Sequence, residues 1–260
     1  METHNARAGR GADAYIARAA RLSRYSKRLL EAEPALALDA GTAFPFSAED
    51  MRAFLRARPS ADDDALKRAL RDLRKRVMLR LIARDLGGLA ELSEVTATTT
   101  ALAEITIAHA LARLEDRLAE RHGRPRAAAG GRAQQLHVVG MGKLGGAELN
   151  VSSDIDLIFA YPEEGETQGP QSISHHEYYT LLGRRLIAAI SEITADGYVF
   201  RVDMRLRPYG DAGPLATSFD AVENYFITQG REWERYAWIN ARALTGDRGV
   251  ELMALARSFV

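Results

Sequence analysis

The chain has 260 residues, of which 47% are hydrophobic and 27% charged, and its 35 basic and 35 acidic side chains give a formal net charge of zero. This balance gives no general attraction to nucleic acid or to an anionic membrane, so we expect neither as a partner. Because the sequence has no cysteine, no signal-peptide pattern at residues 1–10 and no run of roughly 20 apolar residues, we expect a cytoplasmic protein without disulfides or thiolate metal sites.

The first half of the sequence predicts helices. Three stretches, 12–32, 66–86 and 91–121, contain no proline or glycine, and leucine and other apolar residues recur in them near helical spacing. Ser47 is placed to cap a short helix, because acidic residues follow in the first turn. Ser60 is placed in the same way before the next helix.

The second half alternates between strand and helix patterns. A linker rich in Gly, Ala and Arg at 123–134 separates it from the helices. Short apolar runs and one strict alternation predict strands at 136–139, 155–160 and 198–206. Amphipathic spacing and capping residues predict helices at 175–194, 218–229 and 231–244.

This order of elements predicts an α+β fold in three parts. A helical region at 1–130 precedes a core with a small mixed sheet at 131–247. Residues 248–260 begin another helical region that the sequence does not complete, so we expect a fragment of a longer protein.

Two interpretations compete at the glycine-rich segment 140–146. Gly140, Gly142 and Gly145 match the G-x-G-x-x-G pattern of dinucleotide-binding proteins. That fold needs a long helix and a second parallel strand, whereas only eight residues separate Gly145 from Asp154. The spacing therefore favours a strand, a Gly-Gly turn into a short helix, and a second strand that begins at Asp154.

The second strand carries two carboxylates, Asp154 and Asp156. Side chains two positions apart in a strand share one face, so the two carboxylates project together while the apolar residues between them face the core. Adjacent carboxylates repel each other unless a cation lies between them, and Mg²⁺ prefers such oxygen ligands. N–H groups at the start of the short helix, which glycines allow a ligand to approach, would hold a polyphosphate.

A third carboxylate, Asp203, lies in the alternating segment 200–207, on the same face as Arg201, Arg205 and Arg207. If this strand lies beside the Asp-x-Asp strand, three carboxylates meet and can hold two Mg²⁺ ions for in-line phosphoryl transfer. The arginines would then bind phosphate oxygens. A lone Asp-x-Asp or a half-solvated strand is common without any such function, but the combination indicates a metal-dependent nucleotidyl site.

The segments 140–169 and 200–247 resemble glutamine synthetase adenylyltransferase, which belongs to the polymerase β-like nucleotidyltransferase superfamily. The motifs N-V-S-S-D-I-D at 150–156 and V-D-M-R-L-R-P at 202–208 are similar to those of its N-terminal, adenylyl-removing half. The resemblance implies that residues 131–247 remove AMP from a tyrosine of adenylylated glutamine synthetase, with phosphate as acceptor and ADP as product. It also implies that this reaction regulates nitrogen assimilation and that the PII signalling protein sets its direction.

The resemblance also implies roles for individual residues. The catalytic residues and metal ligands would be Asp154, Asp156 and Asp203. The phosphate- or nucleotide-binding residues would be Gly145, Gly146, Ser153, Arg205 and Arg207. Lys143 is either a further phosphate contact or a solvated turn residue. Trp233, in a helix that the family packs beside the site, is expected in the core rather than at a ligand.

Asn240 departs from the family, which usually carries lysine at this position. An amide cannot neutralise a phosphate, so activity is weakened if that lysine takes part in catalysis and unchanged if it only lies at the surface. Two alternative functions stay open. One is ATP-dependent adenylylation of glutamine synthetase, which uses the same metal triad. The other is a truncated, non-catalytic fragment that binds a partner.

Overall fold

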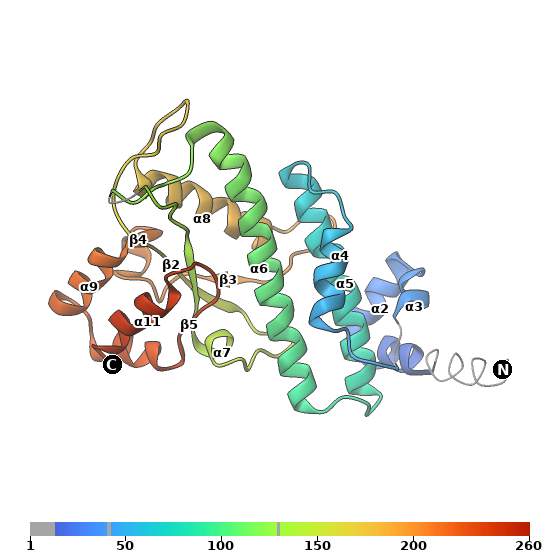
Figure 1. The fold of residues 1–260 in the computed structure, drawn as a ribbon. Coiled ribbons are helices and arrows are strands. Elements are labelled where there is room, and N and C mark those ends of the chain that lie inside the picture. Colours follow the sequence, from blue (N-terminus) through green and yellow to red (C-terminus); the bar gives the residue numbers. More distant parts are fainter. Residues whose placement is uncertain (1–13, 41–42, 129–130) are drawn as a thin grey trace. The chain divides into compact units, whose positions relative to one another are not determined.

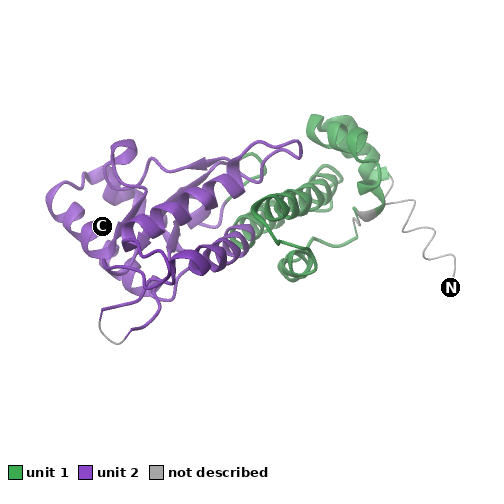
Figure 2. Cartoon of the chain, turned by 90° about the horizontal axis from the view of Figure 1, so that it is seen from above, with its two compact units in different colours: residues 1–105, 149–152 green, residues 106–148, 153–260 purple. Residues whose placement is uncertain are grey.

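The computed structural model describes residues 14–40, 43–128 and 131–260. The chain forms two compact units. Figure 2 shows the first, residues up to 105 with 149–152, in green and the second, residues 106–148 and 153–260, in purple. The expected α+β class is confirmed, because the first unit is built from helices and the second from a mixed sheet with helices.

The helices of the first unit come one after another along the chain. Residues 14–22 form the first described helix. Those that follow are α2 (Arg24–Ala32), α3 (Leu36–Asp39), α4 (Ala48–Arg56), α5 (Asp63–Leu86) and the N-terminal part of α6 (Leu92–His122). Ile16, Leu29 and Leu79 belong to one buried cluster, which joins the early helices to α5 through apolar contacts.

Side-chain caps set where two of these helices begin. At α4, the Asp50 N–H donates to Ser47 Oγ at 3.1 Å and the Ser47 N–H donates to Asp50 Oδ2 at 3.2 Å, which is a capping box. At α5, Asp62 Oδ1 accepts the Ala65 N–H at 2.7 Å. The expected cap at Ser60 is therefore wrong, because the N-cap of α5 is Asp62, whose carboxylate accepts the Ala65 N–H.

The second unit is built on a five-stranded mixed sheet (Figure 1). Its strands are β1 (His137–Gly140), β2 (Ile155–Tyr161), β3 (Val202–Asp203), β4 (Ala216–Ser218) and β5 (Arg242–Ala243). β1 lies antiparallel between β5 and β2, and β3 and β4 pair in parallel with the other edge of β2. Every residue of β2 except Asp156 is buried, so this strand is the centre of the unit.

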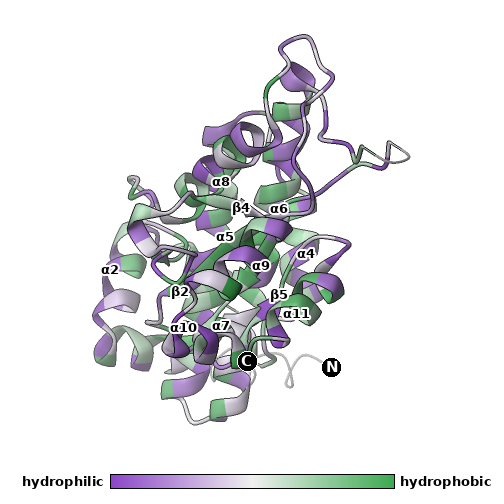
Figure 3. Ribbon diagram, turned by 90° about the vertical axis from the view of Figure 1, so that its left-hand side faces the viewer, coloured by the Kyte–Doolittle hydropathy of each residue, from purple (hydrophilic) through white to green (hydrophobic). Residues whose placement is uncertain are grey.

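Helices pack around the sheet. They are α7 (Gly142–Gly145), α8 (His175–Ser191), α9 (Phe219–Thr228), α10 (Glu232–Ala237) and α11 (Gly249–Arg257), with 3₁₀ turns η1 (Gly210–Ala212) and η2 (Trp238–Asn240). Ile158 of β2 shares a buried cluster with Trp238 and with Leu252 of α11, and Figure 3 shows the strands mostly in the hydrophobic colour. The core tryptophan is thus Trp238, and the expectation that Trp233 lies in the core is wrong, because Trp233 is 54% exposed.

The strand expected at 198–206 is reduced to the two residues of β3. Before β3, the N–H groups of Val199 and Phe200 donate to the Ile190 carbonyl of α8 at 2.9 and 3.2 Å, so they are not available to a neighbouring strand. After Asp203 the backbone turns away from β2. Pairing with β2 is therefore confined to the short stretch around Val202 and Asp203.

Two expected helices are also shorter in the structure. The helix expected at 231–244 ends at Ala237, and its last residues form η2 and β5, because β5 pairs with β1. The helix expected at 175–194 ends at Ser191. Across the residues described, every helix is too short or too polar to cross a lipid bilayer.

Candidate active site

Neighbouring strands bring the predicted carboxylates together. β2 and β3 run parallel in a register that pairs Asp156 with Asp203. Asp154 directly precedes β2 and, being two positions before Asp156, projects to the same face. All three carboxylates therefore lie at one edge of the sheet.

Asp156 differs from the other two carboxylates in its surroundings. It is half-buried, and among the described residues no hydrogen bond or ion pair reaches its side chain. Burial, followed by the nearby charges of Asp203 and Asp154, raises the pKa of Asp156 above its ordinary value. A bound cation would stabilise the charged form of a carboxylate in this setting.

The other two carboxylates are each bound by an arginine. Arg201 donates from Nε and Nη2 to Asp154 Oδ1. Arg205 Nε lies 3.0 Å from Oδ1 and 2.8 Å from Oδ2 of Asp203. This hydrogen bonding by Arg205 holds the pKa of Asp203 below its ordinary value.

The donor chemistry and the placement of the three carboxylates bear on whether they can hold a divalent cation. Within the described part of the chain, no three Asp, Glu or His side chains lie close enough to share one ion. Asp154 and Asp203 face their arginines instead. The donors are nevertheless all hard carboxylate oxygens, and Asp156 is half-buried beside two like charges. The chemistry of these donors is that which Mg²⁺ prefers.

The glycine beside the carboxylates is Gly142. α7 begins at this residue, whose φ is +51°, and a Cβ there would lie 3.3 Å from Asp156 Oδ2. The expected Gly-Gly turn into the helix is wrong, because Gly145 and Gly146 lie at the end of α7 rather than at its start. The sequence did contain the signal for Gly142, since it is the second glycine of the G-x-G-x-x-G pattern.

Gly145 is required for packing. A Cβ at this position would lie 1.8 Å from the backbone oxygen of Asn240 and 2.6 Å from that of Gly140. The η2 turn therefore rests directly on the backbone of α7. Asn240 makes this contact with its main chain, and the residue as a whole is exposed.

The other predicted phosphate or nucleotide contacts are Ser153, Lys143 and Arg207. Ser153 directly precedes the first carboxylate and is half-buried. Lys143 is exposed in α7. Arg207 donates from Nη1 to a carbonyl of its own turn at 2.8 Å and pairs with Asp211 at 3.3 Å, and its charge also helps to lower the pKa of Asp203.

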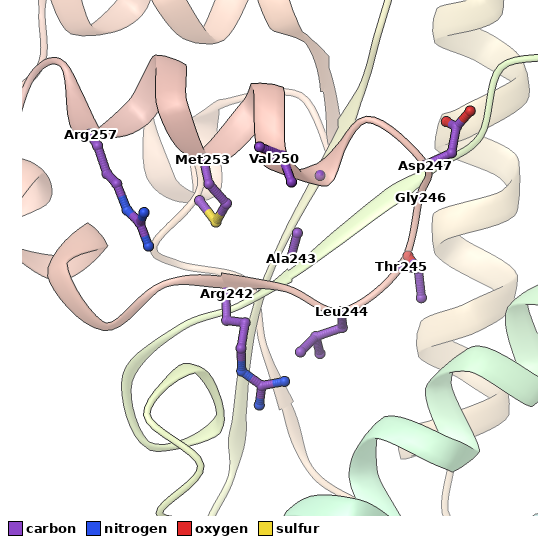
Figure 4. Close-up of a pocket in the computed structure, with 10 residues that line it drawn as sticks. Arg242, Ala243, Leu244, Thr245, Gly246, Asp247, Val250, Met253 and Arg257 are labelled. Carbon is purple, nitrogen blue, oxygen red and sulfur yellow. The ribbon is translucent and has the colours of Figure 1, made fainter.

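A separate groove follows β5, at the opposite edge of the sheet from β3 (Figure 4). It has a volume of about 400 Å³ and runs between β5 and α11, with the apolar side chains of Leu244, Val250 and Met253 and the basic ones of Arg242 and Arg257 in its lining. The described residues that line it include none of the three carboxylates, so the groove is not part of the candidate site.

Known proteins similar to this chain share one family description. The family model for glutamate-ammonia ligase adenylyltransferase matches residues 12–257. A relative from Chromobacterium violaceum is 56% identical over 249 residues, which are 95% of this chain and 28% of the relative. Relatives from Nitrosomonas europaea and Burkholderia mallei are 55% and 53% identical over 92% and 90% of the chain, which correspond to 27% and 26% of their own lengths. All three are called bifunctional glutamine synthetase adenylyltransferase/adenylyl-removing enzyme, and this chain spans about a quarter of their length.

Proposed function

The chain belongs to the glutamate-ammonia ligase adenylyltransferase family, and from this premise we propose that its second unit is a metal-dependent nucleotidyltransferase centre. We propose further that the centre removes AMP from adenylylated glutamine synthetase. The choice of protein substrate is supported by the names of the relatives, which act on glutamine synthetase according to those names.

The observation that carries the proposal is the pairing of Asp156 with Asp203 across β2 and β3, beside Asp154. We propose that these carboxylates hold two Mg²⁺ ions, which when bound would activate the attacking oxygen and neutralise the leaving oxygen. Gly142 supports this placement, because the absence of a side chain there leaves space next to Asp156 for a phosphate group.

In the proposed reaction, an oxygen of inorganic phosphate attacks the phosphorus of the AMP–tyrosine ester. The new P–O bond produces ADP, while the bond to the tyrosyl oxygen breaks and that oxygen takes up a proton. Arg205 would neutralise phosphate charge after leaving Asp203, since its guanidinium can bind two oxygens at once.

The other residues predicted to bind phosphate or nucleotide fall into two groups according to their position in the structure. We propose Lys143, Ser153 and Arg207 as further phosphate or nucleotide contacts, because each lies in α7 or within a few residues of a carboxylate. For Gly145 and Gly146 we propose a structural role instead. They end α7, where a helix presents carbonyl groups rather than the N–H groups that bind phosphate.

We propose removal of AMP rather than its addition because the sequences of the two motifs at 150–156 and 202–208 resemble the adenylyl-removing half of the family. ATP-dependent adenylylation is the second candidate, because the relatives' name includes both activities and the same carboxylates would serve both. Control by the PII protein and a cytoplasmic location are proposed from the resemblance as well.

Phosphorolysis tests the proposal directly. The chain is incubated with adenylylated glutamine synthetase, Mg²⁺ and phosphate, and ADP is measured beside Asp154→Asn and Asp156→Asn variants. ADP that depends on phosphate and on both aspartates is the expected result. If a folded chain releases no ADP but labels unmodified glutamine synthetase from ATP, the second candidate replaces the first. If it does neither, the chain is not a self-sufficient enzyme.

A further inference from the structure

We propose that Arg201 and Arg205 are exchangeable counter-ions of the carboxylate site. Each occupies a metal-binding carboxylate, Asp154 or Asp203, until a divalent cation replaces it, and each is then released to bind phosphate. This inference rests on the proposed function, because it assumes that the carboxylates are the metal ligands.

The contact between Arg201 and Asp154 follows from the pairing of β2 with β3. The Arg201 carbonyl accepts the N–H of Ile155 at 2.9 Å, which fixes the two backbones side by side just before the paired aspartates. From there the Arg201 guanidinium reaches Oδ1 of Asp154. Both side chains are about half exposed, at 58% and 48%, so solvent can reach the pair.

The contact between Arg205 and Asp203 is more extensive. The Arg205 backbone N–H donates to Oδ1 at 2.8 Å, and its Nε contacts both carboxylate oxygens at 2.8 and 3.0 Å. The Arg205 side chain is 75% exposed, whereas that of Asp203 is 19% exposed. The arginine thus covers its carboxylate from the solvent side and can leave without disturbing the core.

These contacts compete with a metal ion for the same lone pairs. A cation that binds Asp156 together with its neighbours needs an oxygen from Asp203. Arg205 contacts both carboxylate oxygens of Asp203. Arg201 contacts Oδ1 of Asp154. We therefore expect Arg205 to oppose cation binding more strongly than Arg201.

The competition is expected to be modest, which makes exchange possible. Ion pairs between exposed side chains contribute little to stability, so removing one should raise cation affinity about two- to fivefold. The released guanidinium groups then lie next to the ion, where they can bind a phosphate. Linkage requires the converse, so phosphate should raise cation affinity by the same factor that the cation raises phosphate affinity.

Mn²⁺ binding to the whole 260-residue chain, measured by electron paramagnetic resonance without substrate, tests this inference. We expect Arg205→Gln to tighten Mn²⁺ binding by about two- to fivefold and Arg201→Gln by less. Arg257→Gln is the matched control, because it removes the same charge from an exposed arginine that lines the groove along β5, outside the carboxylate site. Arg205→Lys keeps the charge and removes the two-pronged contact, so its affinity should lie between wild type and Arg205→Gln.

The outcomes separate the inference from the proposed function. If Mn²⁺ binding is lost in Asp156→Asn but Arg205→Gln has no more effect than Arg257→Gln, the exchange is overturned and the metal site stands. If wild type and Asp156→Asn bind Mn²⁺ equally, or if neither binds it, the metal site and the exchange fail together. Circular dichroism of each variant establishes that it is folded. Inorganic phosphate added to the same titration should tighten Mn²⁺ binding more in wild type than in Arg205→Gln.

Discussion

Replacing Gly145 with alanine should strongly destabilise the second unit, although it adds a single methyl group. The new Cβ would lie 1.8 Å from the Asn240 oxygen and 2.6 Å from the Gly140 oxygen. Both are backbone atoms, which cannot rotate away as a side chain can, so α7 or η2 must move. Overpacking costs roughly 1–3 kcal/mol and occasionally more, and we expect Gly145→Ala to lower the free energy of unfolding by about 3 kcal/mol.

Gly146 provides the matched control in the next position. It is the C-cap of α7 with a φ of −75°, and an added Cβ would lie 3.5 Å from the Gly142 backbone oxygen, which is ordinary van der Waals contact. Gly146→Ala should therefore be neutral or stabilise the chain by about 0.4–1 kcal/mol, because alanine restricts the unfolded state. Urea unfolding followed by circular dichroism measures both. Equal unfolding free energies for the two variants would refute the packing argument and favour the phosphate-binding role first predicted for Gly145.

Three further predictions concern single residues of the second unit. Gly142→Ala should reduce the rate of phosphorolysis by roughly tenfold to a hundredfold, because its Cβ would stand beside Asp156. It should also cost about 1–2 kcal/mol of stability, because residue 142 has a positive φ. A normal rate would contradict the placement of Gly142 beside the reacting groups. Trp238→Ala should cost about 3–5 kcal/mol in urea unfolding, whereas Trp233→Ala should stay within about 0.5 kcal/mol, and a reversed order would show that the wrong tryptophan is in the core. Burial lowers the pKa of His137, so below the ordinary histidine pKa the unfolded chain takes up a proton first and stability falls with falling pH. His137→Gln should flatten this loss between about pH 7 and pH 5, and a loss as steep as that of wild type would contradict the argument.

Elements with strong local signals were predicted correctly from the sequence. The apolar run at 155–160 became β2, and the long helical pattern at 91–121 became α6. Ser47 caps α4 through hydrogen bonds to a residue three positions away, which the sequence shows directly. The sequence also places each of the three aspartates in or next to an apolar strand pattern, but the pairing of β2 with β3 is a long-range contact that no local signal determines.

The errors arose where distant contacts decide between local alternatives. Trp233 and Trp238 lie in one predicted helix, and only packing against the sheet and α11 determines which of them is buried. The sequence predicts Gly145 as a phosphate-binding glycine, because its close contact with the backbone of Asn240, far along the chain, appears only in the structure. Gly142 received no predicted role, because it belongs to the dinucleotide pattern. The spacing excludes the dinucleotide-binding fold, but it does not exclude a role for this glycine beside the site.

The early end of β3 connects the local structure of this site to its proposed chemistry. Asp203 Oδ1 accepts the backbone N–H of Arg205 at 2.8 Å, which is a turn-forming contact that competes with continued strand pairing. An extended strand would hold the side chains of residues 203 and 205 apart on one face, whereas the turn folds Arg205 back onto the carboxylate. On this edge of β2, Leu157 and Ile158 fall between the pairings with β3 and β4. The same aspartate therefore ends the strand, opens the sheet edge beside Asp156 and holds Arg205 at the place where we propose that phosphate binds.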